Sequence, residues 1–327
     1  MAEKLQVAIV GLGLIGASAG LALRRFQDRV YVIGHDRDPE VAGRAKKMGA
    51  VDRTEWNLIN TVRTADRVIL ALPLSEMRAT FEAIAGELKT GCVVMDTASV
   101  KQPVMNWANT LLPDDTYFVG GHPIVLADHA ALEGARADLF DGKLFCLTPD
   151  MHTNDTAVRL ASDVAEALGA RPYFLDAVEH DGLIAAVEHL PAITAAALMS
   201  LVTDSSGWSD MRKLAGSQFF LSTQLAVPSG QEAVDGSFAN RELVAQWLDR
   251  LMDELTEWRE RLVAGDAEEA AKEVDRGLTS GRKWMWAHDH GSWDEEAPSA
   301  DLPTAGSTMR GMLFGRLRMQ PEKSKRK

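Results

Sequence analysis

The first half of the chain alternates short apolar runs with segments of helical periodicity. Apolar and β-branched residues predict strands at Gln6–Val10, Val30–Gly34, Arg67–Ala71, Cys92–Asp96, Tyr117–Val119, Leu144–Thr148 and Pro172–Leu175. Between them, Ile15–Arg25, Pro39–Met48 and Ala157–Leu168 carry apolar residues at helical spacing. Strands separated by helical crossovers imply a parallel sheet that is covered on both faces. We therefore expect an α/β fold, a Rossmann-type doubly wound parallel sheet.

The strand pattern ends after about Asp176, and helical patterns replace it. Apolar residues recur at three- and four-residue spacing in Leu183–Val202, Arg241–Ala264 and Ala267–Met285. Val227–Ser237 is small and polar and predicts a loop. Prolines and a basic end mark the last segment as an extended or mobile tail. We expect a dinucleotide-binding domain at 1–175, an all-helical substrate and dimerisation domain at 176–291, and a tail at 292–327.

Composition narrows the class of partner. Of 327 residues, 47 are acidic and 35 are basic, for a formal net charge of -12, which argues against nucleic acid as a partner. The two cysteines, Cys92 and Cys146, lie in apolar runs and predict buried free thiols. The N-terminus has no basic segment before its apolar stretch, and no apolar run reaches membrane-spanning length. We expect a cytoplasmic protein with no membrane partner.

A glycine-rich turn follows the first strand. Gly11, Gly13 and Gly16 form a G-x-G-x-x-G motif that opens the helix Ile15–Arg25, the context that a dinucleotide site requires. The three glycines allow a tight turn, close approach of a pyrophosphate and close helix packing, and the helix N-terminus attracts phosphate. We expect further cofactor contacts from Leu14, Ile15, Leu72, Pro73 and Ser99.

An acidic residue ends the second predicted strand. Asp36 lies 20 residues after Gly16, where a carboxylate binds the ribose hydroxyls and repels a 2′-phosphate. Arg37 beside it is able to pair with such a phosphate instead. The pattern favours NAD over NADP.

Two candidate catalytic groups lie at strand ends, where the cofactor crevice of this fold is found. His122 follows Gly120-Gly121, and Ser99 follows the strand that ends near Asp96. A histidine suits a base that takes a hydroxyl proton as hydride leaves the carbon. Ser99 either orients that histidine or the substrate, or caps the next helix. We expect Lys101 to be a solvated helix residue.

These residues together resemble the prephenate and arogenate dehydrogenase family of tyrosine biosynthesis. The resemblance runs from about residue 5 to 285 and rests most on Gly11–Gly20 (GLGLIGASAG), Asp96–Lys101 (DTASVK), Gly120–Pro123 (GGHP) and His180-Asp181. It implies a Rossmann domain joined to a helical domain that forms a homodimer. It also implies NAD(P)-dependent oxidative decarboxylation of a cyclohexadienol. His122 would take the ring hydroxyl proton, with Ser99 in support.

The departures from the family pattern concern the small-molecule substrate. The family's H-L-P-H run is His189-Leu190-Pro191-Ala192 here, and Gln224 stands where an arginine holds the substrate carboxylate. Glutamine offers one neutral donor group in place of a charged, bidentate grip. Either Arg212 or Lys213 would supply the positive charge from nearby, or the substrate differs, and Asp128 is a candidate to replace a family glutamate. We hypothesise that hydride transfer is kept while the substrate pocket, which would include His122, Asp128, His189, Gln224 and Arg212, has changed.

Other interpretations remain open from the sequence. A β-hydroxyacid dehydrogenase or imine reductase has the same architecture, but its glycine-rich helix with a lysine is missing near Leu183–Ser200. A non-catalytic NAD(H)-binding module would need neither His122 nor Ser99. We expect no metal site, because the histidines of Trp284–His290 alternate on a helix end. His180 is interpreted as a surface or capping residue and Asp181 as a helix cap.

Overall fold

The computed structural model describes residues 4–125, 131–151, 153–224 and 230–293. The chain divides into two compact units, Met1–Arg250 and Leu251–Lys327. Asp128 and most of the predicted tail lie outside the described residues. The domain boundaries at 175 and 291 stay a prediction.

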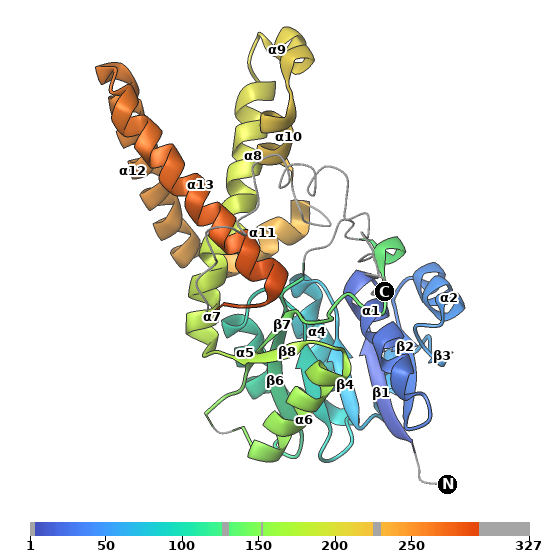
Figure 1. Ribbon diagram of the computed structural model, residues 1–327. Helices are drawn as coiled ribbons and strands as arrows, with labels where there is room; N and C mark the ends of the chain where they lie inside the picture. The colour runs from blue at the N-terminus through green and yellow to red at the C-terminus, as the bar shows by residue number, and fades with distance from the viewer. Residues whose placement is uncertain (1–3, 126–130, 152, 225–229, 294–327) are drawn as a thin grey trace, which may run out of the picture. The chain divides into compact units, whose positions relative to one another are not determined.

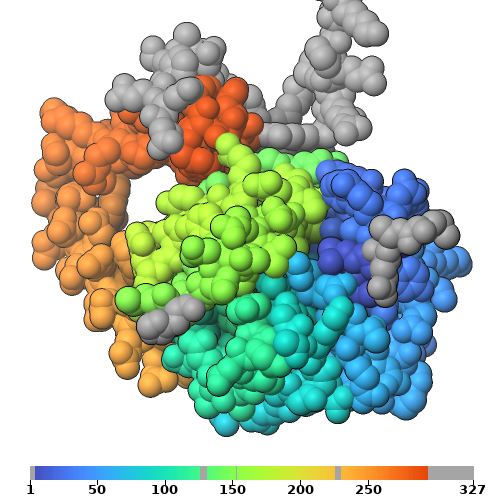
Figure 2. Space-filling model, turned by 90° about the horizontal axis from the view of Figure 1, so that it is seen from below, coloured from blue at the N-terminus to red at the C-terminus, as the bar shows by residue number. Residues whose placement is uncertain are grey.

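One sheet of eight strands forms the frame of the first unit, in the order β3-β2-β1-β4-β5-β6-β7-β8 (Figure 1). All of the strands expected from the sequence are present, and β3 is a two-residue addition at the edge. The strands are β1 Leu5–Val10, β2 Val30–His35, β3 Arg53–Thr54, β4 Arg67–Leu70, β5 Val93–Asp96, β6 Tyr117–Pro123, β7 Leu144–Thr148 and β8 Arg171–Phe174. In Figure 2 the segments run from blue to green side by side, as this order requires. The Rossmann-type fold is confirmed.

The sheet departs from a purely parallel one at β6 and β7. These two strands pair antiparallel, with Gly121 opposite Leu147 and His122 opposite Cys146, whereas β7 and β8 are parallel. Only a short 3₁₀ turn, Leu132–Gly134, is described between β6 and β7. Parallel neighbours need a longer crossover, usually a full helix. The sheet is therefore mostly parallel, with one antiparallel pair that the sequence pattern did not predict.

Two apolar cores cover the two faces of the sheet. One contains buried residues of α1, α2 and α6, and the other contains buried residues of α3, α4 and α5. The helices are α1 Leu14–Leu23, α2 Pro39–Met48, α3 Leu58–Val62, α4 Leu74–Ile84, α5 Gln102–Leu111 and α6 Asp155–Ala167. Cys92 and Cys146 are buried free thiols, as expected. Both faces are thus covered, so the open ends of the strands are left for a ligand.

Only helices follow β8 among the described residues. They are α7 Ala177–Ile184, the π-helical turn η4 Ala185–His189, α8 Leu190–Thr203, α9 Trp208–Leu214, α10 Ser217–Thr223, α11 Gly230–Ala239, α12 Arg241–Ala264 and α13 Ala267–His290. The three long predicted helices are confirmed. The loop expected at Val227–Ser237 was wrong, because residues from Gly230 onward form α11. Small residues lower helix propensity, but packing against α4 and η4 overrides it.

The segment Ala177–Thr203 runs as one continuous helical stretch of 27 residues, and its most apolar 18 residues have a mean hydropathy of 1.5. By length and composition it is able to span a membrane, so the expectation that no run reaches this length was wrong. The sequence hid it because Glu179, Asp181 and Glu188 interrupt the apolar run. Only 22% of these 18 residues are buried. Apolar side chains are therefore exposed along it.

Candidate active site

The glycine turn after β1 has the geometry of a phosphate cradle. Gly11 has φ +89°, and a Cβ there would lie 2.1 Å from the Ala71 carbonyl oxygen. A Cβ on Gly16 would lie 1.9 Å from the Gly11 carbonyl oxygen. These two glycines are required by the fold itself. Gly13 differs, because it is exposed and a Cβ there would meet nothing within 4 Å.

The open space at Gly13 lies at the start of α1. Gly13 is the N-cap of α1, and no side chain of the described residues caps this end. The first N–H groups of a helix need acceptors, and a pyrophosphate supplies them. Leu14 is buried and Ile15 is half-buried in the same turn. The residues present therefore fit a dinucleotide.

The acidic residue at the tip of β2 is fixed beside this turn. Asp36 accepts hydrogen bonds from the Leu12 N–H at 2.8 Å and the Asp38 N–H at 2.9 Å. Each carboxylate oxygen keeps a lone pair for a ribose hydroxyl. Arg37 is ion-paired with Glu76 of α4. Leu72 and Pro73, half-buried, lie between β4 and α4.

A fully buried ion pair joins the tips of β5 and β6. Lys101 donates to the Asp96 carboxylate and, at 2.6 Å, to the Gly121 carbonyl oxygen. Asp96 also accepts from the Gly121 N–H at 2.9 Å. The side chains of Lys101 and Asp96 are both 0% exposed. The expectation that Lys101 is solvated was wrong, because its ammonium is buried against the Asp96 carboxylate and the Gly121 carbonyl oxygen.

This ion pair fixes the backbone that carries His122. Both sides of the Gly121 residue, its N–H and its carbonyl, are bonded to the pair. A Cβ on Gly121 would lie 2.5 Å from the Asp96 carbonyl oxygen, so only glycine fits this close approach. His122 is consequently presented at a defined position at the end of β6.

His122 is buried and faces two side chains from the helices that follow β8. Its Nδ1 lies 3.0 Å from Nε2 of His180, and its Nε2 lies 3.7 Å from a carboxylate oxygen of Glu188. Burial lowers the pKa of His122 well below its ordinary value, and His180, Lys101 and His189 lower it further. The ring is therefore uncharged and able to accept a proton at neutral pH.

Glu188 is a residue that the sequence did not single out. Burial raises the pKa of its carboxyl to about 7, although the side chain remains 42% exposed. It lies in the π-helical turn η4, beside His189. Pro191 follows this turn and has no N–H to donate, which disturbs the helical ladder there. Such π turns are frequent at functional sites.

His180 and Asp181 lie inside the same cluster. The expectation that His180 is a surface or capping residue was wrong, because it is 1% exposed. Its Nδ1 lies 2.9 Å from the Asp181 carboxylate. Asp181 also accepts from the Lys101 and Gln102 N–H groups, at 2.7 and 2.9 Å. Asp181 thus caps a helix as expected, although the helix is α5 rather than its own.

His189 and Ser99 approach each other across α11. A Cβ on Gly236 would lie 3.1 Å from His189 Nε2 and 3.6 Å from Ser99 Oγ. His189 is buried, and neither of its ring nitrogens has a hydrogen-bond partner within the described residues. Ser99 is half-buried. An unpaired buried imidazole is costly, which favours a ligand as its missing partner.

The structure describes two of the three other predicted substrate residues. Arg212 is on α9 and Gln224 follows α10, and both are exposed. Asp128 lies outside the described residues. The substrate roles of these three residues stay predictions.

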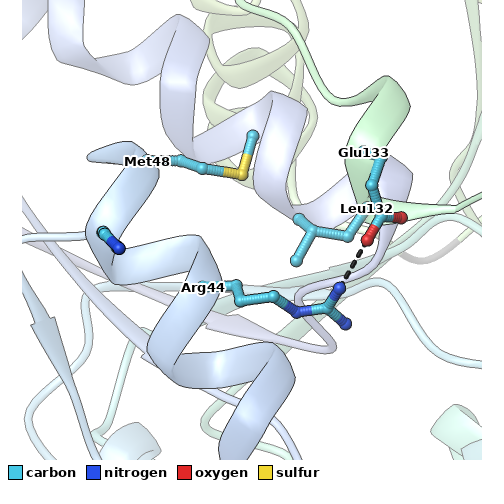
Figure 3. A pocket seen from close by; sticks show the side chains of 5 residues that line it. Arg44, Met48, Leu132 and Glu133 are labelled. Carbon is cyan, nitrogen blue, oxygen red and sulfur yellow. Dashed lines mark hydrogen bonds and ion pairs between the residues drawn. The ribbon is translucent and has the colours of Figure 1, made fainter.

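The described residues hold no group of three or more metal-ligating side chains with metal-site geometry. A pocket of about 330 Å³ lies on the surface at α2 and the 3₁₀ turn Leu132–Gly134. Figure 3 shows that Arg44 and Glu133 form an ion pair across it. It contains none of the residues predicted for the active site, so it is not a candidate for the chemistry.

A Rossmann sheet with an open glycine turn after β1 and a buried histidine at the end of β6 defines an NAD-dependent oxidoreductase. Comparisons with known proteins specify the family. Residues 19–174 match "Prephenate dehydrogenase, nucleotide-binding domain", and residues 176–275 match "Prephenate dehydrogenase, dimerization domain". The chain belongs to the prephenate and arogenate dehydrogenase family.

Individual relatives cover most of the chain. Cyclohexadienyl dehydrogenase of Zymomonas mobilis is 31% identical over 265 residues, 80% of this chain and 90% of the relative. Prephenate dehydrogenase of Bacillus subtilis is 28% identical over 264 residues, 80% of this chain and 71% of the relative. The crystal structure of Aquifex aeolicus prephenate dehydrogenase with hydroxyphenyl propionate and NAD⁺ has a TM-score of 0.78 and 26% identity, and covers 85% of this chain and 98% of that one.

These matches decide between the interpretations left open by the sequence. The resemblance to the prephenate and arogenate dehydrogenases is confirmed, and so is the assignment of NAD as the cofactor. The β-hydroxyacid dehydrogenase and the non-catalytic binding module are not favoured. The roles of single residues in the site stay predictions.

Proposed function

We propose that this chain oxidatively decarboxylates prephenate or a closely related cyclohexadienol in tyrosine biosynthesis. The observation that carries the proposal is the buried His122, uncharged and fixed at the end of β6, in the same sheet as the strand that leads into the glycine turn. When bound, the nicotinamide accepts a hydride from the ring carbon that bears the hydroxyl.

His122 Nε2 holds the hydroxyl proton while the hydride leaves. The bond between the ring and its carboxylate breaks, and its electron pair makes the ring aromatic as carbon dioxide departs. The proton then returns to the phenol oxygen or to solvent, so no net proton is consumed. We propose that Ser99 and His189, which flank Gly236, bind the substrate and support His122.

The substrate pocket is proposed to differ from that of the family in its grip on a carboxylate. The resemblance places Gln224 at a position where an arginine binds the substrate. We expect NADH formation from prephenate to have a high KM, because hydrogen bonds to charged groups contribute about 1.5–3 kcal/mol each. The variant Gln224→Arg is expected to lower this KM by about tenfold or more.

The test is steady-state NADH formation with prephenate and, separately, with arogenate as substrate. The matched control is Gln231→Arg, which places the same new charge on an exposed glutamine of α11 and should leave KM unchanged. A micromolar KM for prephenate in the unmodified chain would refute the altered pocket. No turnover of either substrate would refute the proposed reaction.

We propose a preference for NAD over NADP. A 2′-phosphate on the ribose would face the Asp36 carboxylate, and Arg37 is already paired with Glu76. We expect NADH to bind at least about tenfold more tightly than NADPH, because a close like-charge contact costs more than about 1.4 kcal/mol. The variant Asp36→Asn should narrow the ratio, as measured by fluorescence titration with both cofactors.

The neighbouring variant Asp38→Asn serves as the control for the cofactor titration. Asp38 caps α2 through the Glu40 N–H and is exposed, so its substitution should leave the NADH to NADPH ratio unchanged. Equal affinities for both cofactors in the unmodified chain would contradict the proposed preference.

We propose a cytoplasmic homodimer formed through the helical segment. Exposed apolar residues along Ala177–Thr203 include Leu183, Val187 and Leu201, at 50%, 70% and 73% exposure. Such a surface is costly in water and marks an interface. The match of residues 176–275 to a dimerization domain supports a subunit contact as the cover.

A further inference from the structure

A chain of hydrogen bonds runs from a buried carboxylate to the proposed catalytic histidine. The Asp181 carboxylate lies 2.9 Å from His180 Nδ1, and His180 Nε2 lies 3.0 Å from His122 Nδ1. Asp181, His180 and His122 are all buried, at 1%, 1% and 7% exposure. Solvent therefore does not compete for these hydrogen bonds.

The direction of each hydrogen bond follows from the carboxylate at one end. An ionised carboxylate only accepts, so His180 Nδ1 must carry a proton and donate it. In a neutral imidazole the other nitrogen is then an acceptor, so His180 Nε2 accepts from His122 Nδ1. His122 Nε2 is left without a proton and with a free lone pair.

We propose that Asp181 and His180 are positioning residues that hold His122 in the tautomer with a proton on Nδ1 and a bare Nε2. The inference deepens the proposed function and rests on it, because the bare Nε2 is the atom that would take the hydroxyl proton. The opposite tautomer of His122 would donate a hydrogen bond to that hydroxyl and block its deprotonation.

The Asp181 carboxylate, from which this series of hydrogen bonds begins, is itself fixed in place. Two N–H groups at the start of α5, those of Lys101 and Gln102, donate to Asp181. Asn240 donates to the Asp181 carbonyl oxygen at 2.7 Å. The Lys101 and Gln102 N–H groups stabilise the Asp181 charge without requiring a charged His180, and Asn240 fixes the Asp181 backbone. The neutral form of His180 is the one that leaves His122 Nε2 bare.

The direct test reads the tautomer of His122 by long-range ¹H–¹⁵N NMR of the labelled, unmodified protein without substrate. The signals that are missing from the spectrum of His122→Gln identify the His122 ring. We expect this ring to have an unprotonated Nε2 and a protonated Nδ1. In Asp181→Asn the side-chain amide is able to donate to His180 Nδ1. His180 Nε2 then carries a proton and donates to His122 Nδ1, so the His122 proton moves to Nε2. We expect kcat to fall about 10²-fold or more with little change in KM.

Asp176→Asn is the matched control for the loss of a helix cap. Asp176 caps the start of α7 through the Val178 N–H at 2.8 Å and lies outside the hydrogen-bonded chain. It should preserve both the His122 tautomer and kcat. If Asp181→Asn fails to fold, His180→Phe is the alternative variant. It keeps the hydrogen bonds by which the Asp181 carboxylate caps α5, and it removes the group that accepts the hydrogen bond from His122 Nδ1. His180→Phe should give a mixture of the two tautomers.

Three outcomes would overturn the proposal. They are a protonated Nε2 on His122 in the unmodified protein, an unchanged tautomer in both variants, and an equal loss of kcat in Asp176→Asn. The NMR result needs no turnover, so it stands even if the chain oxidises neither prephenate nor arogenate. Failure of the proposed function and failure of this inference are therefore distinguishable.

Discussion

Replacement of His122 by glutamine is expected to lower kcat by about 10²–10⁴-fold, the range that a general base contributes. Glutamine approximates the size of the ring but cannot take a proton. The affinity for NADH should be unchanged, because the cradle at Gly13 and the Asp36 carboxylate are formed by other strands. Steady-state NADH formation and fluorescence titration with NADH measure the two effects on the same preparation.

His290→Gln is the control for the removal of an imidazole. His290 lies at the end of α13, where Nδ1 contacts the Trp286 carbonyl oxygen. Its substitution should leave kcat unchanged. A His122→Gln variant that retains more than about a tenth of the original kcat would exclude His122 as the base, given that range of effects.

The pH profile gives a second readout for the same histidine. Because the pKa of His122 lies well below its ordinary value, the ring stays uncharged as pH falls through about 6.5, where a free histidine is protonated. His180, Lys101 and His189 disfavour the charged ring, while Glu188 faces Nε2 and ionises near its pKa of about 7.

The pH profile is therefore best recorded in the variant Glu188→Gln, which lacks the carboxyl group that titrates near pH 7. There, kcat/KM should remain level down to a pH below about 6.5 and fall only at more acidic values. A loss of activity centred at the ordinary histidine pKa would show that His122 is not the base, or that its ring is not buried in solution.

Sequence patterns predicted the frame of this molecule well. Parallel strands buried on both faces give apolar runs without alternation, and Val68–Leu70 and Val93–Met95 are such runs. The glycine spacing predicted a turn whose geometry the structure confirms at Gly11 and Gly16. Local physics sets these features, so a linear pattern is enough to reveal them.

The surroundings of His122 were harder to predict because they depend on long-range contacts. His180 and Glu188 lie more than 50 residues away along the chain, and both reach the ring through the helical segment. Lys101 follows Ser99 in a polar stretch that is typical of a helix start, yet its ammonium is buried against Asp96 and the Gly121 carbonyl oxygen. No periodicity marks a buried charge, because its partner is chosen by tertiary packing.

That buried charge leads to the second large expected effect. The variant Lys101→Met should lower the free energy of unfolding by about 3–5 kcal/mol, the cost of leaving a buried partner charge unpaired. Asp96 keeps two amide donors, Ala98 and Gly121, each at 2.9 Å, but loses the cation that neutralises it. Urea unfolding followed by circular dichroism measures the change.

A surface lysine provides the matched control for this stability measurement. Lys213 pairs with Asp210 at 2.8 Å on α9, where both side chains are exposed, and such pairs contribute about 0–1 kcal/mol. Lys213→Met should therefore change stability little. The double variant Asp96→Leu with Lys101→Met removes both charges and should recover part of the loss, because an apolar pair has no charge to desolvate. If Lys101→Met alone were as stable as the unmodified chain, the ammonium could not be buried against Asp96. The backbone of Gly121, and with it the placement of His122, would then have to be held by other contacts.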